Sequence, residues 1–263
     1  MVDETATREL VVGNPKERIP LPFGIYCPGC HYGSIVRIIC EALEEMNLGD
    51  RAVGLAGVGC SFGSYNIFIN IDFVACPHGR APAMATAMKR IYPDNFVLTV
   101  QGDGDLGAIG LGCWMNALNR GEMLSTVFLN NACYGTTGGQ MAPTTLWGQK
   151  TTTTSTGRDP RTTGFPFHGA ELAAQMPGVA YSARVSLHTP KNFREAKKAV
   201  KAAFEKQVKG IGYGFVEMLS ACPTNWKMSP VECCQWIEDT MIKEYPLGVF
   251  KDVDKIPLPQ DWR

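Results

Sequence analysis

The stretch NFVLTVQGDGDLGAIG, residues 95–110, is the strongest indication of the fold, and STVFLNN, residues 125–131, completes the unit that it begins. Each stretch starts with a run of apolar and β-branched residues that has the length of a buried strand. The segment between them, residues 106–120, is predicted to be a helix. A strand, a helix and a second strand in this order form a βαβ unit, whose strands run parallel. The sequence therefore predicts an α/β fold, with a mostly parallel sheet flanked by helices.

Polar residues stand at the ends of both predicted strands. Gly102-Asp103-Gly104-Asp105 follows the first strand, and Asn130-Asn131 ends the second. The carboxyl ends of parallel strands share one edge of the sheet, where open α/β sheets bind ligands. Glycines let the backbone approach a phosphate, and the first amides of the next helix point toward it. Because Asp and Asn oxygens are suitable ligands for Mg²⁺, we predict a metal and phosphate site at this edge.

Further elements are predicted on both sides of the βαβ unit. An apolar stripe from Ile35 to Met46 indicates an amphipathic helix. The other predicted elements are a strand at 52–57, a helix at 82–90, a helix beginning at Thr189-Pro190, a strand at 215–219 and a helix beginning with the capping-box spacing at Ser229. We predict one domain over residues 21–245, an N-terminal arm over 1–20, and an extended C-terminal arm over 246–263 that contacts a partner.

Composition narrows the possible partners and locations. The 263 residues carry no formal net charge, so nucleic acid is not expected as a partner. No run of about 18 apolar residues is present, and no membrane-spanning segment is expected. The first residues, MVDETATREL, are polar and unlike a secretory signal. The expected location is the cytoplasm.

Ten cysteines are many for a chain of this kind. Cys27 and Cys30 form a CxxC directly before the first predicted helix, while Cys60 and Cys222 each follow a predicted strand. These four can converge on the same sheet edge, where four thiolates would suit a [4Fe–4S] cluster or a structural zinc ion. A CxxC alone could also be a redox dithiol. The remaining cysteines are interpreted as structural: Cys40, Cys76, Cys113, Cys133, Cys233 and Cys234.

The chain from about residue 20 onward resembles the β subunits of the 2-oxoacid:ferredoxin oxidoreductases, and within them the 2-oxoisovalerate type. The matching pieces are YCPGC (26–30), GVGCS (57–61), HGRAPAMATAMKR (78–90), QGDGDLGAIG (101–110), NN-x-x-YGTTGGQMAPTT (130–145), CPTNW (222–226) and PLGVFKD (246–252). GDG followed by NN is similar to the thiamine-diphosphate signature. The resemblance thus implies a thiamine-diphosphate-binding fold for the predicted domain.

The resemblance also implies a set of site residues. Mg²⁺ is expected on Asp103, Asn131 and the backbone carbonyl of Cys133, and a [4Fe–4S] cluster on Cys27, Cys30, Cys60 and Cys222. The residues expected to bind thiamine diphosphate are Gly102, Asp103, Gly104, Asp105, Asn131, Tyr134, Gly135, Thr136, Thr137 and His78. His31 departs from the family, which more often has Gly after CPGC. Its ring could hydrogen-bond a cluster sulfur or be an ordinary surface group.

The activity implied by the resemblance is the coenzyme A-dependent oxidative decarboxylation of a 2-oxoacid, with branched-chain substrates expected. Electrons would pass through the cluster to ferredoxin. The implied partners are α, γ and ferredoxin-like δ subunits. The family's activating glutamate lies on a partner, so no catalytic side chain is expected in this chain. Arg158, in the polar loop TTTTSTGRDPRTTG (151–164), is a candidate for coenzyme A binding or for an interface.

Two other functions remain open from the sequence. One is an iron-free thiamine-diphosphate decarboxylase or synthase subunit, in which the cysteines would have no shared role. The other is a zinc-stabilised, non-catalytic assembly subunit, which leaves GDGD and NN without a purpose. Metal and cofactor analysis separates the three possibilities.

Overall fold

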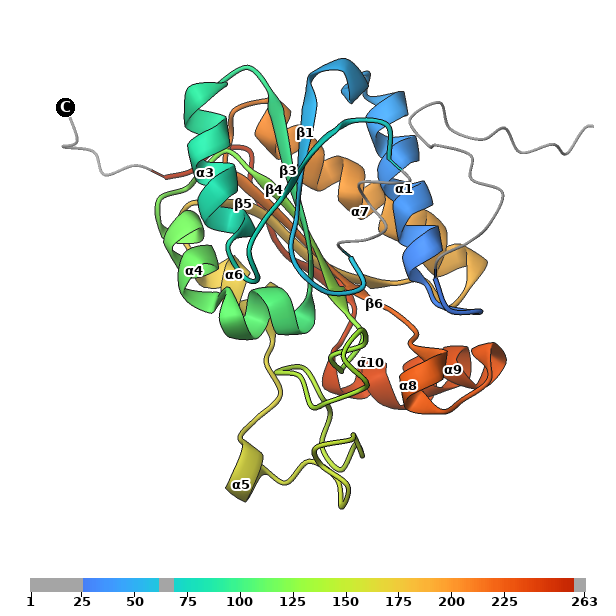
Figure 1. Ribbon diagram of the computed structural model, residues 1–263. Helices are drawn as coiled ribbons and strands as arrows, with labels where there is room; N and C mark the ends of the chain where they lie inside the picture. Colours follow the sequence, from blue (N-terminus) through green and yellow to red (C-terminus); the bar gives the residue numbers. More distant parts are fainter. Residues whose placement is uncertain (1–25, 62–68, 258–263) are drawn as a thin grey trace, which may run out of the picture.

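The computed structural model describes residues 26–61 and 69–257, and a seven-stranded sheet runs through it (Figure 1). The strands are β1 (Ala52–Ala56), β2 (Asp72–Ala75), β3 (Phe96–Gly102), β4 (Ser125–Asn130), β5 (Val179–Ser186), β6 (Tyr213–Leu219) and β7 (Gly248–Asp252). Their order in the sheet is β2-β1-β3-β4-β6-β5-β7. All neighbours pair in parallel except β7, which pairs antiparallel with β5. The predicted α/β fold is confirmed.

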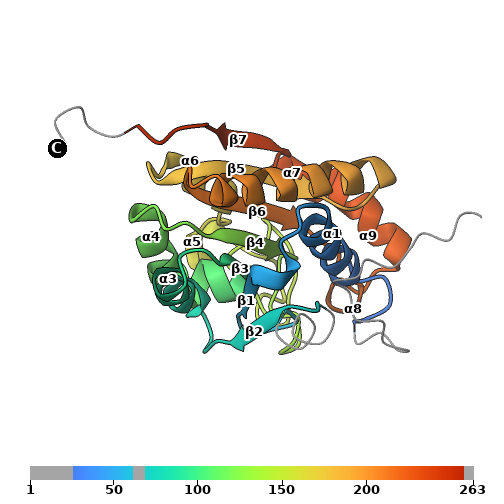
Figure 2. The ribbon, with the colours of Figure 1, turned by 90° about the horizontal axis from the view of Figure 1, so that it is seen from above.

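Helices cover both faces of the sheet (Figure 2). The larger helices are α1 (Tyr32–Glu45), α3 (Ala81–Ile91), α4 (Leu111–Asn119), α6 (Gly169–Gln175) and α7 (Pro190–Val208). One apolar core joins α1 and α7 to the sheet, and a second joins α3, α4 and α6 to the opposite face. Because both faces are covered, the central strands β3, β4 and β6 are buried almost along their whole length.

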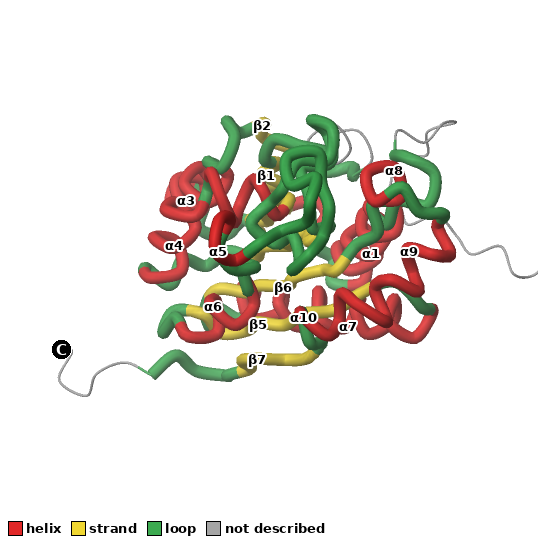
Figure 3. Tube along the Cα trace, turned by 90° about the horizontal axis from the view of Figure 1, so that it is seen from below, coloured by secondary structure: helices red, strands yellow, loops and turns green. Residues whose placement is uncertain are grey.

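Shorter elements gather near the carboxyl ends of the strands. They are α5 (Pro160–Thr163), α8 (Pro223–Trp226), α9 (Pro230–Trp236), α10 (Ile242–Glu244) and two π-helical turns, Asp105–Ile109 and Ile237–Met241. A 3₁₀ turn, Gly49–Arg51, precedes β1 at the other edge. Figure 3, viewed from below, shows the long loop after β4 lying across the sheet end, next to α8 and α9.

The predicted helix starts are confirmed in detail. The Thr189 hydroxyl accepts the Asn192 amide at the start of α7, and Pro190 occupies the first helical position. At the start of α9, Ser229 and Glu232 form a reciprocal capping box. The predicted helix over 106–120 is in fact a π-helical turn followed by α4. None of the described helices is sufficiently long and apolar to cross a bilayer.

Part of the predicted C-terminal arm belongs to the sheet. Residues 248–252 form β7, which pairs with β5 from Arg184 to Tyr181. Lys206 of α7 adds ion pairs to Asp252 at 2.6 Å and Asp254 at 2.9 Å. The domain boundaries at 20 and 245 stay predictions, and the predicted arm over 1–20 lies outside the described residues.

A buried amide fastens α7 to the amino end of the sheet. The Gln207 carbonyl oxygen accepts the Val97 amide at 2.7 Å, and its nitrogen donates to the Val97 carbonyl at 2.8 Å and to Ser125 Oγ at 3.0 Å. The β3–β4 ladder begins only at Leu98, paired with Ser125. Gln207 therefore supplies the partner that β4 does not give to Val97.

Replacing this amide tests its contribution to the fold. Gln207→Leu should lower the free energy of unfolding by about 2–4 kcal/mol, because it leaves the buried Val97 amide and carbonyl without a partner. Urea unfolding followed by circular dichroism measures the change. Gln235→Leu is the matched control, since Gln235 is exposed and bonds only to Asp239 on its own helical segment. Equal losses in both variants would contradict the role assigned to Gln207.

Candidate functional site

The predicted site residues lie at the carboxyl edge of the sheet. Asp103 follows β3, Asn131 follows β4 and Cys222 follows β6, three strands that are neighbours in the sheet. The register places Gly102 opposite Leu129, and Asn130 opposite Leu219. Parallel pairing therefore brings three motifs together that are far apart in the sequence.

The Asp103 carboxylate is buried without an opposite charge. It is 2% exposed, and no Lys or Arg among the described residues forms an ion pair with it. The Gly104 amide donates to it at 2.8 Å, and the Thr144 hydroxyl also donates to it. Burial raises the pKa of Asp103 to about 7, which these hydrogen bonds only partly oppose. Because an unpaired buried carboxylate is costly, the position is suited to a bound cation.

Asn131 presents a second oxygen that the protein leaves unused. Its side chain is 4% exposed, and its Oδ1 is buried with no hydrogen-bond partner among the described groups. Trp226 Nε1 donates to the Asn131 carbonyl at 3.0 Å, and Ala132 next to it has a left-handed φ of 55°. The Asp103 carboxylate also interacts with the Ala132 amide. Asp103 and Asn131 thus offer two hard oxygens in one neighbourhood, which fits Mg²⁺. The third expected ligand, the Cys133 carbonyl, stays a prediction.

Asp105 points to a different set of groups. Its Oδ1 accepts the Gly79 amide at 2.7 Å and the Val58 amide at 3.2 Å, and it lies 2.5 Å from His78 Nδ1. A Cβ at Gly57 would come within 1.9 Å of Asp105 Oδ2, so the chain passes very close. Asp105 therefore ties the loops after β1 and β2 to the GDGD turn. Direct cofactor binding by Asp105 and His78 stays a prediction.

The loop after β4 covers the GDGD turn. A Cβ at Gly104 would lie 2.1 Å from the Tyr134 ring, and the Tyr134 hydroxyl donates to the Gly104 carbonyl at 3.3 Å. Thr137 donates to Gln140 Oε1 at 2.7 Å, whereas Thr136 turns toward Cys60. Tyr134 is thus placed against the predicted diphosphate site, while Thr136 belongs to the neighbouring cysteine group.

Four cysteines gather beside this site. Cys30 interacts electrostatically with Cys27, Cys60 and Cys222, and Cys60 interacts with Cys222 and Cys27. Burial raises the pKa of Cys30 to about 12. The pKa of Cys222 is lowered to about 6, mainly because the Cys133 thiol donates a hydrogen bond to it. The four predicted cluster ligands are therefore neighbours, and Cys133, interpreted from the sequence as structural, adjoins them.

The CxxC turn packs on the segment that carries Cys222. Gly29 has a φ of +76°, and a Cβ there would lie 2.3 Å from Pro230 at the start of α9. Pro223, the first residue of α8, is the next neighbour of that position. A side chain at Gly29 would push the turn away from α8 and α9. The glycine thus lets Cys27 and Cys30 approach Cys222.

The described residues do not separate the metal alternatives. Within residues 26–61 and 69–257, no group of three or more His, Cys, Asp or Glu side chains is placed to hold a metal ion. The [4Fe–4S] cluster and the structural zinc ion both stay predictions.

His31 does not contact any of these four sulfurs through a hydrogen bond. Its Nε2 lies 3.8 Å from the Sγ of Cys234, which is not one of the predicted ligands. Burial lowers the pKa of His31 to about 4, helped by the nearby His188, so the ring is neutral at pH 7. Of the two roles left open for His31, the contact with a cluster sulfur is not present in this arrangement.

A buried ion pair that the sequence analysis missed holds the Asn130-Asn131 turn. Glu217 and Arg184 are both fully buried in adjacent strands, with Arg184 Nε 3.0 Å from Glu217 Oε2. Glu217 Oε1 accepts the side-chain amide of Asn130 at 2.7 Å, and Asn130 Oδ1 accepts the Ala132 amide at 3.2 Å. A charge inside the apolar run YGFVEML is the signal that could have revealed this role.

Arg158 is a structural residue of the long loop. It is 5% exposed, and its guanidinium donates to the carbonyls of Thr145 at 2.6 Å, Phe165 at 2.6 Å and Pro143 at 2.7 Å. Its donors are thus used by backbone of the same loop. The expected role in coenzyme A binding or at an interface is replaced by one in which Arg158 joins the segment at Pro143 and Thr145 to Phe165.

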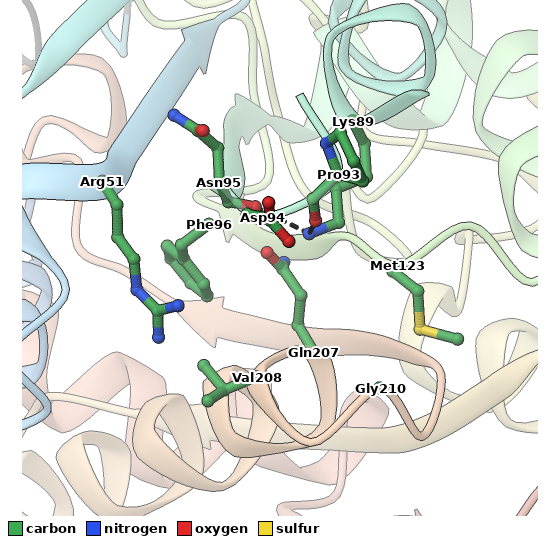
Figure 4. Close-up of a pocket in the computed structure, with 10 residues that line it drawn as sticks. All are labelled: Arg51, Lys89, Pro93, Asp94, Asn95, Phe96, Met123, Gln207, Val208 and Gly210. Carbon is green, nitrogen blue, oxygen red and sulfur yellow. Dashed lines mark hydrogen bonds between the residues drawn. The ribbon is translucent and has the colours of Figure 1, made fainter. Parts of the chain in front are cut away.

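A further pocket lies at the opposite edge of the sheet (Figure 4). It has a volume of about 240 Å³ and is lined by residues near the amino ends of the strands, among them Phe96 and Gln207. Lys89, which is partly buried, already donates to the carbonyls of Pro93 at 2.7 Å and Asn95 at 2.6 Å. Because Lys89 and Gln207 are both paired within the chain, this pocket is a weaker candidate than the carboxyl edge.

Comparison with known proteins gives the family of the chain. The family described as thiamine pyrophosphate enzyme, C-terminal TPP binding domain, matches residues 57–211. The ketoisovalerate oxidoreductase subunit VorA of Methanothermobacter thermautotrophicus is 45% identical, over 86% of this chain and 47% of its own length. The 2-oxoglutarate synthase subunit KorB of Archaeoglobus fulgidus is 33% identical, over 86% of this chain and 84% of its own length.

A solved structure shares the fold. The 2-oxoglutarate:ferredoxin oxidoreductase from Magnetococcus marinus aligns with a TM-score of 0.77 and 23% identity, covering 96% of this chain and 88% of that one. The fold and the matched family define a thiamine-diphosphate-binding domain. The chain belongs to the β-subunit family of the 2-oxoacid:ferredoxin oxidoreductases, which confirms the resemblance found in its motifs. It spans about half the length of the VorA relatives.

The role of Arg158 can be tested against a neighbouring arginine. Arg158→Met should lower the free energy of unfolding by roughly 3–5 kcal/mol and speed amide hydrogen exchange across residues 142–165, because several buried carbonyls lose their donor. Arg161→Met is the control, since Arg161 pairs with Asp159 in solvent. It should change neither quantity. Unaltered exchange in the Arg158 variant would argue against the assigned role.

Proposed function

We propose that this chain binds thiamine diphosphate and Mg²⁺ and acts as a subunit of a 2-oxoacid:ferredoxin oxidoreductase. The observation that carries the proposal is the buried, uncompensated Asp103 carboxylate next to the unpaired Oδ1 of Asn131. Two oxygens that the protein leaves without a cation are expected where Mg²⁺ and a diphosphate complete the site. Membership in the enzyme family supports the same conclusion.

The residues around Asp103 and Asn131 have different proposed roles in binding Mg²⁺ and the diphosphate. Asp103, Asn131 and the Cys133 carbonyl hold Mg²⁺, while the backbone at Gly102 and Gly104 leaves room for the diphosphate. Tyr134 closes over the GDGD turn, and Asp105 fixes that turn to the loops after β1 and β2. Thiamine diphosphate supplies the nucleophilic carbon and the electron sink for decarboxylation. The protein orients the cofactor and keeps its charge neutralised.

We also propose that Cys27, Cys30, Cys60 and Cys222 hold a [4Fe–4S] cluster. Their placement supports this assignment. Cys60 adjoins Gly135, Asn225 joins the Gly135 carbonyl to Cys222, and the turn that carries Cys27 and Cys30 packs on Pro223. A cluster there would accept the electrons released by decarboxylation and pass them to ferredoxin. The iron-free decarboxylase or synthase alternative requires this grouping of four cysteines to have no shared purpose.

The relatives support the proposed substrates and partners. The 45% identity to a ketoisovalerate oxidoreductase subunit favours branched-chain 2-oxoacids over 2-oxoglutarate, with coenzyme A as acyl acceptor. The chain covers only 47% of that relative. Separate α, γ and ferredoxin-like δ subunits are proposed to supply the rest, including the activating glutamate.

Removing the metal ligand tests the cofactor assignment. Asp103→Asn should weaken thiamine diphosphate binding by more than about 100-fold in the presence of Mg²⁺, because the amide cannot balance the cation's charge. Isothermal titration calorimetry on the full chain or its complex measures the affinity. Asp239→Asn, an exposed carboxylate on the C-terminal π turn, is the control. Parental affinity in the Asp103 variant would exclude the proposed metal site.

Iron analysis tests the cluster assignment. The anaerobically purified chain should contain about four irons and four sulfides, together with one thiamine diphosphate when the cofactor is supplied. Cys222→Ala should lose most of the iron, whereas Cys113→Ala, on α4, should retain it. Cofactor without iron would favour the decarboxylase or synthase alternative. Zinc without cofactor would favour the assembly subunit.

A further inference from the structure

The loop after β4 places a hydroxyl group on one of the four gathered cysteines. The Thr136 Oγ1 donates to the Sγ of Cys60 at 2.9 Å. A side chain at Gly135, the preceding residue, would crowd the same sulfur, because its Cβ would lie 3.1 Å from it. The loop backbone is therefore held against Cys60, and the Thr136 hydroxyl faces the sulfur directly.

A second donor reaches a different cysteine of the group. Asn225 of α8 donates its side-chain amide to the Sγ of Cys222 at 3.2 Å, and the same nitrogen lies 3.1 Å from the Gly135 carbonyl. Asn225 also fills the space over Gly139, where a Cβ would meet its Oδ1 at 2.8 Å. One amide thus joins Cys222 to the loop that carries Thr136. The two donors belong to one hydrogen-bonded unit, although 89 positions separate them in the chain (225 minus 136).

Such donors have a known physical effect on an iron–sulfur group. Reduction adds negative charge, part of which resides on the cysteine sulfurs. A hydrogen bond to a sulfur stabilises that added charge and therefore raises the reduction potential. The effect needs no contact with iron, so it can be assigned from the positions of donor and sulfur alone.

We infer that Thr136 and Asn225 are positioning residues that raise the reduction potential of the group held by Cys27, Cys30, Cys60 and Cys222. The inference rests on the proposed cluster and adds two residues to it. It also moves Thr136 from the diphosphate pocket, where it is expected from the family motif, to the cysteine group. The loop from Asn131 to Thr136 then serves both sites, with Asn131 on the metal side and Thr136 on the sulfur side.

The chain offers a matched set of variants. Thr136→Val keeps the size and shape of the side chain and removes only the hydroxyl donor. Thr137→Val makes the same change at the next residue, whose hydroxyl donates to Gln140 Oε1 instead of a sulfur. Thr136→Ser restores the donor. Asn225→Asp replaces a donor with a negative charge beside Cys222.

The test is a redox titration of the full chain, reconstituted anaerobically with iron and sulfide and reduced stepwise with dithionite. Electron paramagnetic resonance follows the reduced fraction, and iron content is measured on each sample. The full chain is used without other subunits, so that no partner cluster contributes to the signal. Thr136→Val should shift the midpoint potential to a more negative value, and Asn225→Asp should shift it further. Thr137→Val and Thr136→Ser should titrate with the parent.

The outcomes separate the inference from the proposal beneath it. A parent chain that binds no iron overturns the cluster assignment and this inference with it. A full iron content with the same potential in the parent, Thr136→Val and Asn225→Asp overturns the inference and leaves the cluster assignment intact. An equal shift in Thr136→Val and Thr137→Val would also overturn it, because the effect would then not follow the hydrogen bond to Cys60.

Discussion

The parallel pairing of β3, β4 and β6 is the constraint on which the rest of the structure depends. Each strand ends in a different motif, and the register aligns the three ends at one edge of the sheet. Asp103, Asn131 and Cys222 meet for this reason alone. A shift of register would separate the two oxygens proposed for Mg²⁺ and would move Cys222 away from the other cysteines. The apolar cores on both faces maintain the register, because they bury the central strands on both sides.

Buried charged side chains then position the backbone at the carboxyl edge of the sheet. Arg184 and Glu217 stabilise each other inside the sheet, where neither would be tolerated alone. Through its second oxygen, Glu217 holds Asn130, and Asn130 in turn holds the backbone at Ala132. These hydrogen bonds thereby stabilise the left-handed backbone conformation at Ala132. Asp103 is buried in the same region without such a partner, and this difference between the two carboxylates supports the proposal that Asp103 binds a cation.

The loop between Asn131 and Arg158 connects the two proposed chemical groups. Its first residues face the diphosphate site, and Thr136 faces the cysteines. Arg158 holds the loop by donating to the carbonyl of Pro143 within it and to that of Phe165 after it. The proposed metal ligand Asn131 and the sulfur donor Thr136 thus lie on one loop, which Arg158 joins to the segment after it.

Much of the fold and part of the candidate site were predictable from local sequence. The βαβ unit, the helix caps at Thr189 and Ser229, and the positions of GDGD and NN at strand ends depend on neighbouring residues and on the period of the apolar pattern. The pairing of β7 with β5 was not predicted, because an edge strand has only a weak pattern of its own. Family motifs predicted the four cluster cysteines, since one residue type at four matching positions is specific even without coordinates.

The order of strands and helices and the family follow from the sequence, and the metal and cysteine residues stay predictions drawn from it. The contacts of Glu217, Arg158 and Thr136 are evident only in the folded chain. Each of these side chains acts through partners that its own neighbourhood in the sequence does not reveal, such as Cys60 for Thr136 and Asn130 for Glu217. Hydrogen bonds and buried ion pairs depend on distances of a few ångströms between atoms of different elements. Those distances are set by the packing of the whole sheet and its loops, and local propensity carries no information about them.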